Sequence, residues 1–176
     1  NSIKAMSELI SKCYKPMVID ADGLNILAKN KELLKKLPEN TILTPHPKEF
    51  ERLFGKSKDS FARIKKQKKY SKEFKLIIVL KGAHTSITTP EGKCYFNSTG
   101  NPGMATGGSG DVLTGIVLSL LAQGYKPVDA ALISVYIHGL SGDIALEDES
   151  MESLIAGDIV YYLGDAFNEL KKPGND

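Results

Sequence analysis

Short apolar runs alternate with longer stretches of helical periodicity along most of the chain. Residues 17–19, 41–43 and 76–80 form such runs, and the last of them contains no polar residue. A continuous apolar run is expected for a parallel strand that is covered on both faces. Residues 85–89 and 93–96 flank a Pro-Glu-Gly turn, which predicts a β-hairpin.

The segments between and after these strands carry apolar residues at helical spacing. Residues 58–74 are rich in lysine, with Phe61, Ile64 and Tyr70 as a sparse apolar stripe. We expect a solvated helix there rather than a nucleic-acid-binding patch. Residues 127–146 are apolar on nearly every side, which indicates a central helix. Helices are expected over residues 3–12, 24–37, 48–54, 58–74, 127–146 and 157–170, and from the Gly-rich stretch at 100–110 through Gln123.

Strands that alternate with helices predict a layered α/β fold. In open α/β sheets, ligands bind beyond the carboxyl ends of the strands. Polar segments stand at three of these ends: Asp-Ala-Asp at residues 20–22, Thr-Pro-His-Pro at 44–47 and Lys-Gly-Ala-His-Thr at 81–85. We therefore expect a binding site along this edge of the sheet.

Composition and charge narrow the class of protein. The 176 residues suit one domain with a single core, and 41% hydrophobic and 25% charged residues are ordinary for a globular chain. A net charge of +2 gives no argument for nucleic acid or an acidic membrane as partner. No apolar run approaches the roughly 20 residues that span a bilayer, and no signal peptide opens the sequence. We expect a cytoplasmic protein.

The two cysteines, Cys13 and Cys94, lie far apart in the sequence. There is no Cys-x-x-Cys pair or Cys/His cluster, so a zinc site is not expected. A disulfide is open in principle, but the pattern favours two thiols in a cytosolic protein.

The Gly-rich stretch at residues 101–111 carries the strongest chemical signal. Glycines let backbone N–H groups point into one concavity that opens onto a helix N-terminus, and this arrangement favours an anion. It is neither a Walker loop nor a dinucleotide fingerprint, because the Gly-Lys-Ser/Thr and G-x-G-x-x-G spacings are missing. Asp111 would repel phosphate, so one reason for it is base catalysis on a hydroxyl that attacks a phosphoryl group. The alternative is a carboxylate that only caps the helix after a tight turn.

Residues 106–111, Thr-Gly-Gly-Ser-Gly-Asp, resemble the anion-hole motif of the ribokinase-like superfamily. The wider string at 101–113, Asn-Pro-Gly-Met-Ala-Thr-Gly-Gly-Ser-Gly-Asp-Val-Leu, is more specific and resembles the NAD(P)H-hydrate dehydratases of that superfamily. Residues 18–25, 44–50 and 80–85 match the same family in the same order. The resemblance implies a ribokinase-like three-layer α/β/α fold with a mostly parallel central sheet.

The resemblance also implies roles for particular residues. The positions that match His46 and Asp111 contact the hydrated NAD(P)H, and Asp111 is the catalytic base. The backbone from Gly108 to Gly110 would stabilise charge on the transferring group. The expected nucleotide-binding residues are Lys81, Gly82, Ala83, His84, Thr85, Gly108, Ser109 and Gly110, and no protein metal ligand is expected.

The activity implied by the resemblance is the repair of a damaged cofactor. A nucleotide phosphorylates the hydroxyl on the hydrated nicotinamide ring, phosphate leaves, and NAD(P)H is restored. ADP or ATP and Mg²⁺ are the expected cofactors. We expect a homo-oligomer and no nucleic-acid or membrane partner.

The resemblance covers only part of a family domain. A complete domain is about 100 residues longer on its N-terminal side, within the usual size range of domains. The chain therefore resembles a single, N-terminally incomplete dehydratase domain over residues 1–176. The missing segment, and an epimerase domain that is often fused upstream in bacteria, are expected as further partners.

Two other functions are open at this stage. A small-molecule kinase of the same superfamily, acting on hydroxymethylpyrimidine, hydroxyethylthiazole or a sugar, would use the same anion site, although residues 44–47 and 101–103 argue against it. A shortened domain that only binds nucleotide is the third hypothesis. Glu49, Asn25 and His84 are weaker site candidates, and His138 is expected to be a hydrogen-bonded core histidine.

Overall fold

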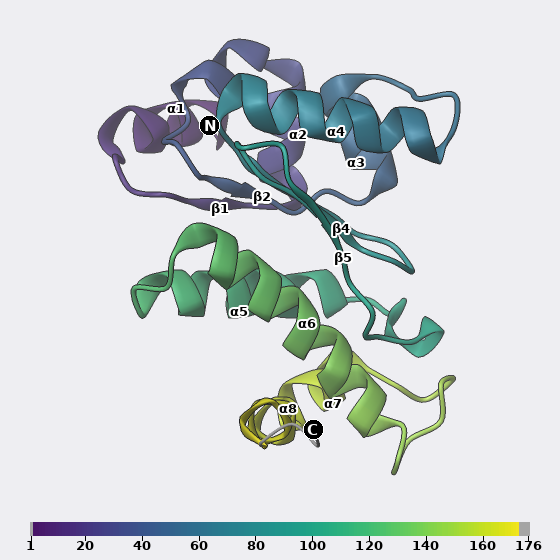
Figure 1. The fold of residues 1–176 in the computed structure, drawn as a ribbon. Coiled ribbons are helices and arrows are strands. Elements are labelled where there is room, and N and C mark those ends of the chain that lie inside the picture. The colour runs from purple at the N-terminus through teal and green to yellow at the C-terminus, as the bar shows by residue number, and fades with distance from the viewer. Residues whose placement is uncertain (1, 173–176) are drawn as a thin grey trace.

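Helices cover both faces of a central sheet in the computed structural model, which describes residues 2–172 (Figure 1). The strands lie side by side in the order β1-β2-β3-β4-β5. The first three pair in parallel and the last two are added antiparallel, so the sheet is mixed. The bounds are β1 (Val18–Ile19), β2 (Ile42–Leu43), β3 (Ile77–Leu80), β4 (Ser86–Thr88) and β5 (Cys94–Phe96).

The helices form two layers, and the expected ribokinase-like α/β/α arrangement is confirmed (Figure 1). One face of the sheet carries the first four helices, and α5 and α6 cover the other. The last two helices pack on α6 away from the sheet. The bounds are α1 (Ser2–Lys12), α2 (Ala21–Lys29), η1 (Lys31–Lys36), α3 (Pro47–Phe54), α4 (Ser60–Phe74), η2 (Pro102–Met104), α5 (Ser109–Ala122), α6 (Pro127–Ala145), α7 (Ala156–Tyr161) and α8 (Leu163–Lys171).

The central strand β3 explains why its sequence is continuously apolar. Successive side chains of a strand point to opposite faces of the sheet. Ile78 and Leu80 pack with the first helical layer, whereas Ile77 and Val79 pack with α5 and α6. All four are buried, and full burial of such a side chain stabilises the fold by about 1.5–3 kcal/mol.

Helix α4 differs from its sequence prediction. Phe61, expected in its apolar stripe, is 87% exposed, and the buried residues of the helix are Gln67 and Ser71. Gln67 Nε2 donates to the carbonyls of Ile78 and Ser86, 2.9 and 3.0 Å away. The stripe is therefore correct only in part: Tyr70 packs on the core and stacks with Phe54, whereas hydrogen bonds to the strands take the place of apolar contacts nearer the start of the helix.

Two predicted helices are broken. The helix expected over 24–37 ends at Lys29 and resumes as η1, because Asn30 leaves the helical region and its Nδ2 donates to the Ile26 carbonyl. The helix expected over 157–170 is divided at Tyr162, whose hydroxyl donates to the Asp148 carboxylate. The remaining helices and the hairpin follow their predictions within a few residues.

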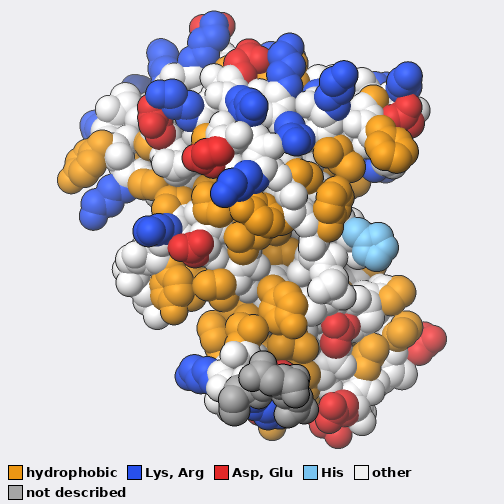
Figure 2. Space-filling view, viewed as in Figure 1, with side chains coloured by type: hydrophobic (Ala, Val, Ile, Leu, Met, Phe, Trp, Pro, Cys, Tyr) orange, Lys and Arg blue, Asp and Glu red, His pale blue; other side chains and the backbone are white. Residues whose placement is uncertain are grey.

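The surface reflects this layering (Figure 2). Lys and Arg side chains gather over the layer that contains α4, and hydrophobic side chains run across the middle of the view, over β5 and α6. Cys13 and Cys94 are free thiols. Among residues 2–172, no helix has the length and apolar character needed to cross a membrane.

Candidate functional site

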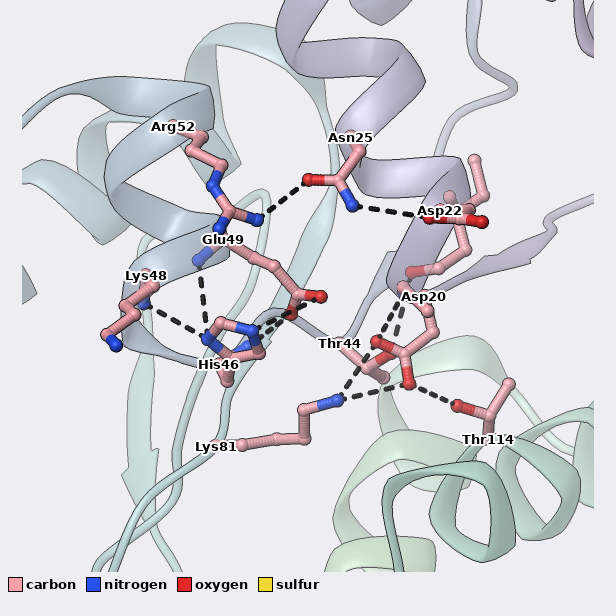
Figure 3. Close-up of polar contacts among 12 residues, drawn as sticks. Asp20, Asp22, Asn25, Thr44, His46, Lys48, Glu49, Arg52, Lys81 and Thr114 are labelled. Carbon is pink, nitrogen blue, oxygen red and sulfur yellow. Dashed lines mark hydrogen bonds and ion pairs between the residues drawn. The ribbon is translucent and has the colours of Figure 1, made fainter. Parts of the chain in front are cut away.

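The polar segments after β1, β2 and β3 meet at one edge of the sheet, as their positions predicted (Figure 3). Lys81 Nζ, after β3, lies 2.9 and 3.1 Å from the two carboxylate oxygens of Asp20, after β1. The backbone N–H of Lys81 donates to the Pro45 carbonyl, after β2, at 2.9 Å. This convergence follows from the parallel pairing, which brings the three carboxyl ends together.

Asp20 holds several groups at once. Its Oδ1 caps α2 by accepting from the Ala21 N–H at 2.8 Å, and its Oδ2 accepts from Thr114 Oγ1 on α5 at 2.9 Å. The side chains of Asp20 and Lys81 are only 9% and 23% exposed. One carboxylate thus joins strand ends and the helix on the opposite face.

The Gly-rich stretch is fixed to α6 before it reaches the site. Asn101 Nδ2 donates to the Gly142 carbonyl at 2.9 Å and to Asp143 Oδ1 at 3.0 Å. The N–H of Gly100 donates to Asp143 Oδ2 at 2.7 Å, and Asn101 Oδ1 caps η2 through the Gly103 N–H. These contacts set the path of residues 106–111, which we name the glycine loop.

The glycine loop leads directly into α5. Gly108, the N-cap, has φ of 89°, a left-handed conformation that favours glycine. Within residues 2–172, the N–H groups of Gly110 and Asp111 have no hydrogen-bond partner. Free N–H groups at the positive end of a helix favour an anion.

Gly110 is the closest point between the loop and the strand ends. A Cβ added there would lie 3.2 Å from Lys81 Nζ and 3.8 Å from Asp20 Oδ2. The ammonium group therefore stands beside the first turn of α5. A side chain at position 110 would push it away.

Asp111 lies in the first turn of α5 and is exposed to solvent. Among residues 2–172, no hydrogen bond or ion pair engages its carboxylate. The cap of this helix is Gly108, not Asp111, so a pure capping role is not what the geometry provides.

His138 supports the glycine loop from α6. Its Nε2 lies 2.9 Å from the Ser109 carbonyl and 3.3 Å from Ser109 Oγ. Burial lowers the pKa of His138 below 6.5; the hydrogen bond to Ser109 opposes this shift and the Lys81 charge adds to it. The expectation of a hydrogen-bonded inner histidine is confirmed, with the partner being the loop itself.

His46 caps α3 between two prolines. Its Nδ1 accepts from the N–H groups of Lys48 and Glu49, at 3.1 and 3.4 Å, so the neutral ring carries its proton on Nε2. Glu49 Oε2 accepts from the His46 N–H at 2.8 Å, and Glu49 Oε1 lies 3.4 Å from His46 Nε2. The Glu49 side chain is 7% exposed and that of His46 44%, so a half-exposed imidazole rests on a buried carboxylate.

A second polar chain runs beside this cap (Figure 3). Arg52 on α3 donates to Asn25 Oδ1 on α2 at 2.9 Å, and Asn25 Nδ2 contacts Asp22 Oδ1 at 3.5 Å. Asn25 was a weak candidate in the sequence, and here it joins the motif at residues 18–25 to helix α3.

The segment predicted to hold a nucleotide borders a hollow of about 340 Å³. Thr85 Oγ1 closes the turn by accepting from the Gly82 N–H and donating to the Gly82 carbonyl. Gly82, Ala83 and His84 are exposed. The hollow is lined by Lys81, Gly82, Ala83 and His84 together with Arg63 and Ile64 of α4.

Sequence reasoning missed Thr114 and Arg52. Thr114 follows Gly110 by four residues, so the two share a face of α5 and both meet the strand ends, which the spacing could have revealed. Arg52 offered no signal, because its partner Asn25 comes from a distant motif. Within residues 2–172, no three His, Cys, Asp or Glu side chains are grouped to hold a metal ion.

Comparisons with known proteins identify the family of this chain. A family model described as NAD(P)H-hydrate dehydratase matches residues 1–163. The chain is 43% identical to the bifunctional NAD(P)H-hydrate repair enzyme of Moorella thermoacetica over 164 residues, which is 92% of this chain and 31% of that protein. It is 42% identical to the ADP-dependent (S)-NAD(P)H-hydrate dehydratase of Neisseria meningitidis over 150 residues, or 82% of this chain and 51% of the relative.

A solved structure extends the likeness to three dimensions. The ADP/ATP-dependent NAD(P)H-hydrate dehydratase of Bacillus subtilis, co-crystallised with ATP and Mg²⁺, superposes with a TM-score of 0.81 at 31% identity. The match covers 94% of this chain and 60% of that one. The chain thus spans about a third to a half of the length of these curated relatives.

Proposed function

The chain belongs to the NAD(P)H-hydrate dehydratase family, and we propose that its protein uses an adenine nucleotide to convert NAD(P)H hydrate back to NAD(P)H. One observation carries this proposal above the others. An exposed Asp111 stands in the first turn of α5, where free N–H groups and the Lys81 ammonium surround a place for a phosphoryl group.

The phosphoryl transfer uses the glycine loop. Asp111 takes the proton of the hydrate hydroxyl as its oxygen attacks the terminal phosphorus of the nucleotide. The N–H groups at Gly110 and Asp111 donate to the oxygens on which charge develops. Phosphate then leaves with the electrons of the C–O bond, the neighbouring ring carbon loses a proton, and the double bond of NAD(P)H is restored.

His46 is proposed to contact the hydrate. Because Nδ1 is occupied by the cap of α3, Nε2 is the ring nitrogen that could donate to a substrate oxygen, which would share it with Glu49 Oε1, 3.4 Å away. Glu49 fixes the ring, so the donor is oriented before the substrate binds. Asp111 would then face the hydroxyl of the same bound hydrate.

The nucleotide is proposed to bind along residues 81–85 and the glycine loop, with contacts from Lys81, Gly82, Ala83, His84 and Thr85 and from Gly108, Ser109 and Gly110. The hollow beside residues 81–84 supports room for a ligand there. Mg²⁺ is proposed to come with the nucleotide, and phosphate oxygens would supply most of its ligands.

Further parts of the system are proposals of the same kind. The named relatives that match along about a third of their length are bifunctional repair enzymes. We propose that the working protein includes an N-terminal segment that completes the dehydratase domain, and that an epimerase activity acts on the same hydrate pool. A homo-oligomer remains our expectation.

The test is a repair assay on the protein with its natural N-terminal extension. Hydrated NADH is incubated with Mg²⁺ and with ADP or ATP, and the absorbance of NADH is followed. We expect recovery that requires nucleotide. Recovery that is absent with either nucleotide would refute the proposal, and a phosphorylated product that accumulates without elimination would identify a kinase instead.

A further inference from the structure

Asp20, Lys81 and Thr114 form a polar cluster that the proposed reaction does not yet use. We name it the Asp20 clamp. Each member comes from a different element: the end of β1, the end of β3 and the second turn of α5. The two carboxylate oxygens of Asp20 lie 2.9 and 3.1 Å from Lys81 Nζ, and Asp20 Oδ2 lies 2.9 Å from Thr114 Oγ1.

The clamp fixes where the Lys81 charge lies. A lysine side chain has a flexible four-carbon stem, so an unheld ammonium group would sample many positions. Here Asp20 contacts it with both carboxylate oxygens while Thr114 restrains Oδ2 from the opposite layer. The ammonium group is therefore fixed beside Gly110, where an added Cβ would lie 3.2 Å away.

The cluster is not explained by stability alone. Removing two charges from water costs free energy that a partly buried ion pair often fails to recover. The pair is only 23% and 9% exposed, and it stands next to N–H groups that have no partner in the described chain. A fixed positive charge beside free N–H donors is suited to an anionic group held between them.

We propose that Asp20 is a positioning residue for phosphoryl transfer: with Thr114, it holds the Lys81 ammonium against the first turn of α5, so that it contacts the terminal phosphate of the nucleotide. This inference rests on the proposed function, because it assigns the phosphate to the same site. Asp20 acts only through Lys81 and touches no reacting atom.

A double-mutant cycle tests this dependence. D20N keeps the shape and the cap of α2, because asparagine is also a good N-cap, but it removes the charge that holds Lys81. We expect kcat to fall about 100-fold, as for a catalytic group misplaced by roughly 1 Å, and the KM for nucleotide to rise as well, because the same ammonium group contacts the terminal phosphate before the reaction. K81Q should lower kcat at least as much, and the double variant should be no slower than K81Q.

Two results would overturn the inference. If the effects of D20N and K81Q multiply, Asp20 has a role of its own. If D20N instead raises the Mg²⁺ concentration required for half-maximal rate while kcat at saturating Mg²⁺ is normal, Asp20 is a metal ligand and not a clamp.

Thr114 supplies a pair of variants without a change of charge. T114S keeps the hydroxyl and should retain kcat, whereas T114V leaves Asp20 Oδ2 without this donor and should lower kcat about tenfold, together with a lower melting temperature. Equal rates for the two variants would remove Thr114 from the clamp.

ADP binding separates this inference from the proposed function. Calorimetric titration with ADP and Mg²⁺ reports the phosphate site even where no hydrate is turned over. Weaker binding on D20N in the parent, but not in the K81Q background, supports the clamp whether or not the repair assay succeeds. Equal weakening in both backgrounds contradicts it, and no ADP binding by the parent protein sinks both ideas.

Discussion

The two ends of the candidate site present polar groups in opposite ways. At the His46 end, the polar side chains have partners within the site. Nδ1 of His46 caps α3, Glu49 Oε2 accepts from the His46 N–H, and Arg52 donates to Asn25 Oδ1. At the glycine loop, the donors are backbone N–H groups, and those of Gly110 and Asp111 have no partner in the described chain. One end is closed on itself, and the other is open.

We infer from this difference that the network at His46 orients the substrate, whereas the glycine loop stabilises the charge that develops in the reaction. A closed hydrogen-bond network fixes an imidazole edge at little cost, because each buried group has a partner. Free N–H groups at an exposed helix end are hydrated until an anionic ligand replaces the water, and there they stabilise its charge. The largest effects of mutation should therefore fall at the loop, and the smaller ones at the closed network.

The largest effect is expected for Asp111→Asn. Loss of a general base lowers rates by about 10²–10⁴-fold, and the exposed position means that folding should be unaffected. Rates in the repair assay and ADP affinity by calorimetry check this, with affinity retained. Asp129→Asn is the matched control, since Asp129 is also exposed in the first turn of a helix. Equal rates for both variants would mean that Asp111 is not the base.

The next effect is expected for Gly110→Ala. Its Cβ would lie 3.2 Å from Lys81 Nζ, so the ammonium group must shift by a few tenths of an ångström, and we expect kcat to fall roughly tenfold. Gly115→Ala is the control on the same helix, because no atom lies within 4 Å of the added Cβ. It should keep its rate and gain about 0.5–1 kcal/mol in free energy of unfolding. A G110A variant with a normal rate would show that the approach of Lys81 does not matter.

Much of the site around the glycine loop could be predicted from the sequence. The glycines and Asp111 form a local pattern, and hydrophobic runs placed the strands whose ends meet there. The contacts that close the site could not be read, because Lys81 and Asp20 are 61 residues apart and Thr114 and Asp20 are 94 apart. Such pairings are decided by the topology of the fold and not by local spacing.

The fold shows the same division. The strand β3 was predicted because burial on both faces demands an unbroken apolar run. Helix α4 was predicted as a helix, but its contact with the sheet was not, since Gln67 donates to strand carbonyls that no sequence pattern predicts and Phe61 lies in solvent. Apolar periodicity predicts packing well, whereas buried polar contacts have to be seen.

A smaller effect is expected at the closed end. His46→Asn keeps an N-cap but loses the Nε2–H edge, so the KM for hydrate should rise about tenfold with little change in melting temperature. His46→Ala should also lose about 1 kcal/mol of free energy of unfolding. Asp59→Ala, which removes the cap of α4, should lose similar stability at constant KM. A KM that stays constant in H46N would remove His46 from the substrate site.

The smallest expected effect is a pH dependence of stability that arises from His138, which supports the glycine loop. Because burial lowers the pKa of His138 in the folded protein, the unfolded chain takes up this proton at a higher pH than the folded chain does. Stability must then fall as pH drops below 6.5, with a slope of at most about 1.4 kcal/mol per pH unit. Urea unfolding at about pH 7.5 and 5.5 measures this, on either side of the ordinary histidine pKa. His138→Gln should lose that part of the slope, while His84→Gln, at an exposed histidine, should keep it. An unchanged slope in H138Q would mean that the imidazole under the glycine loop takes up its proton as freely as in the unfolded chain.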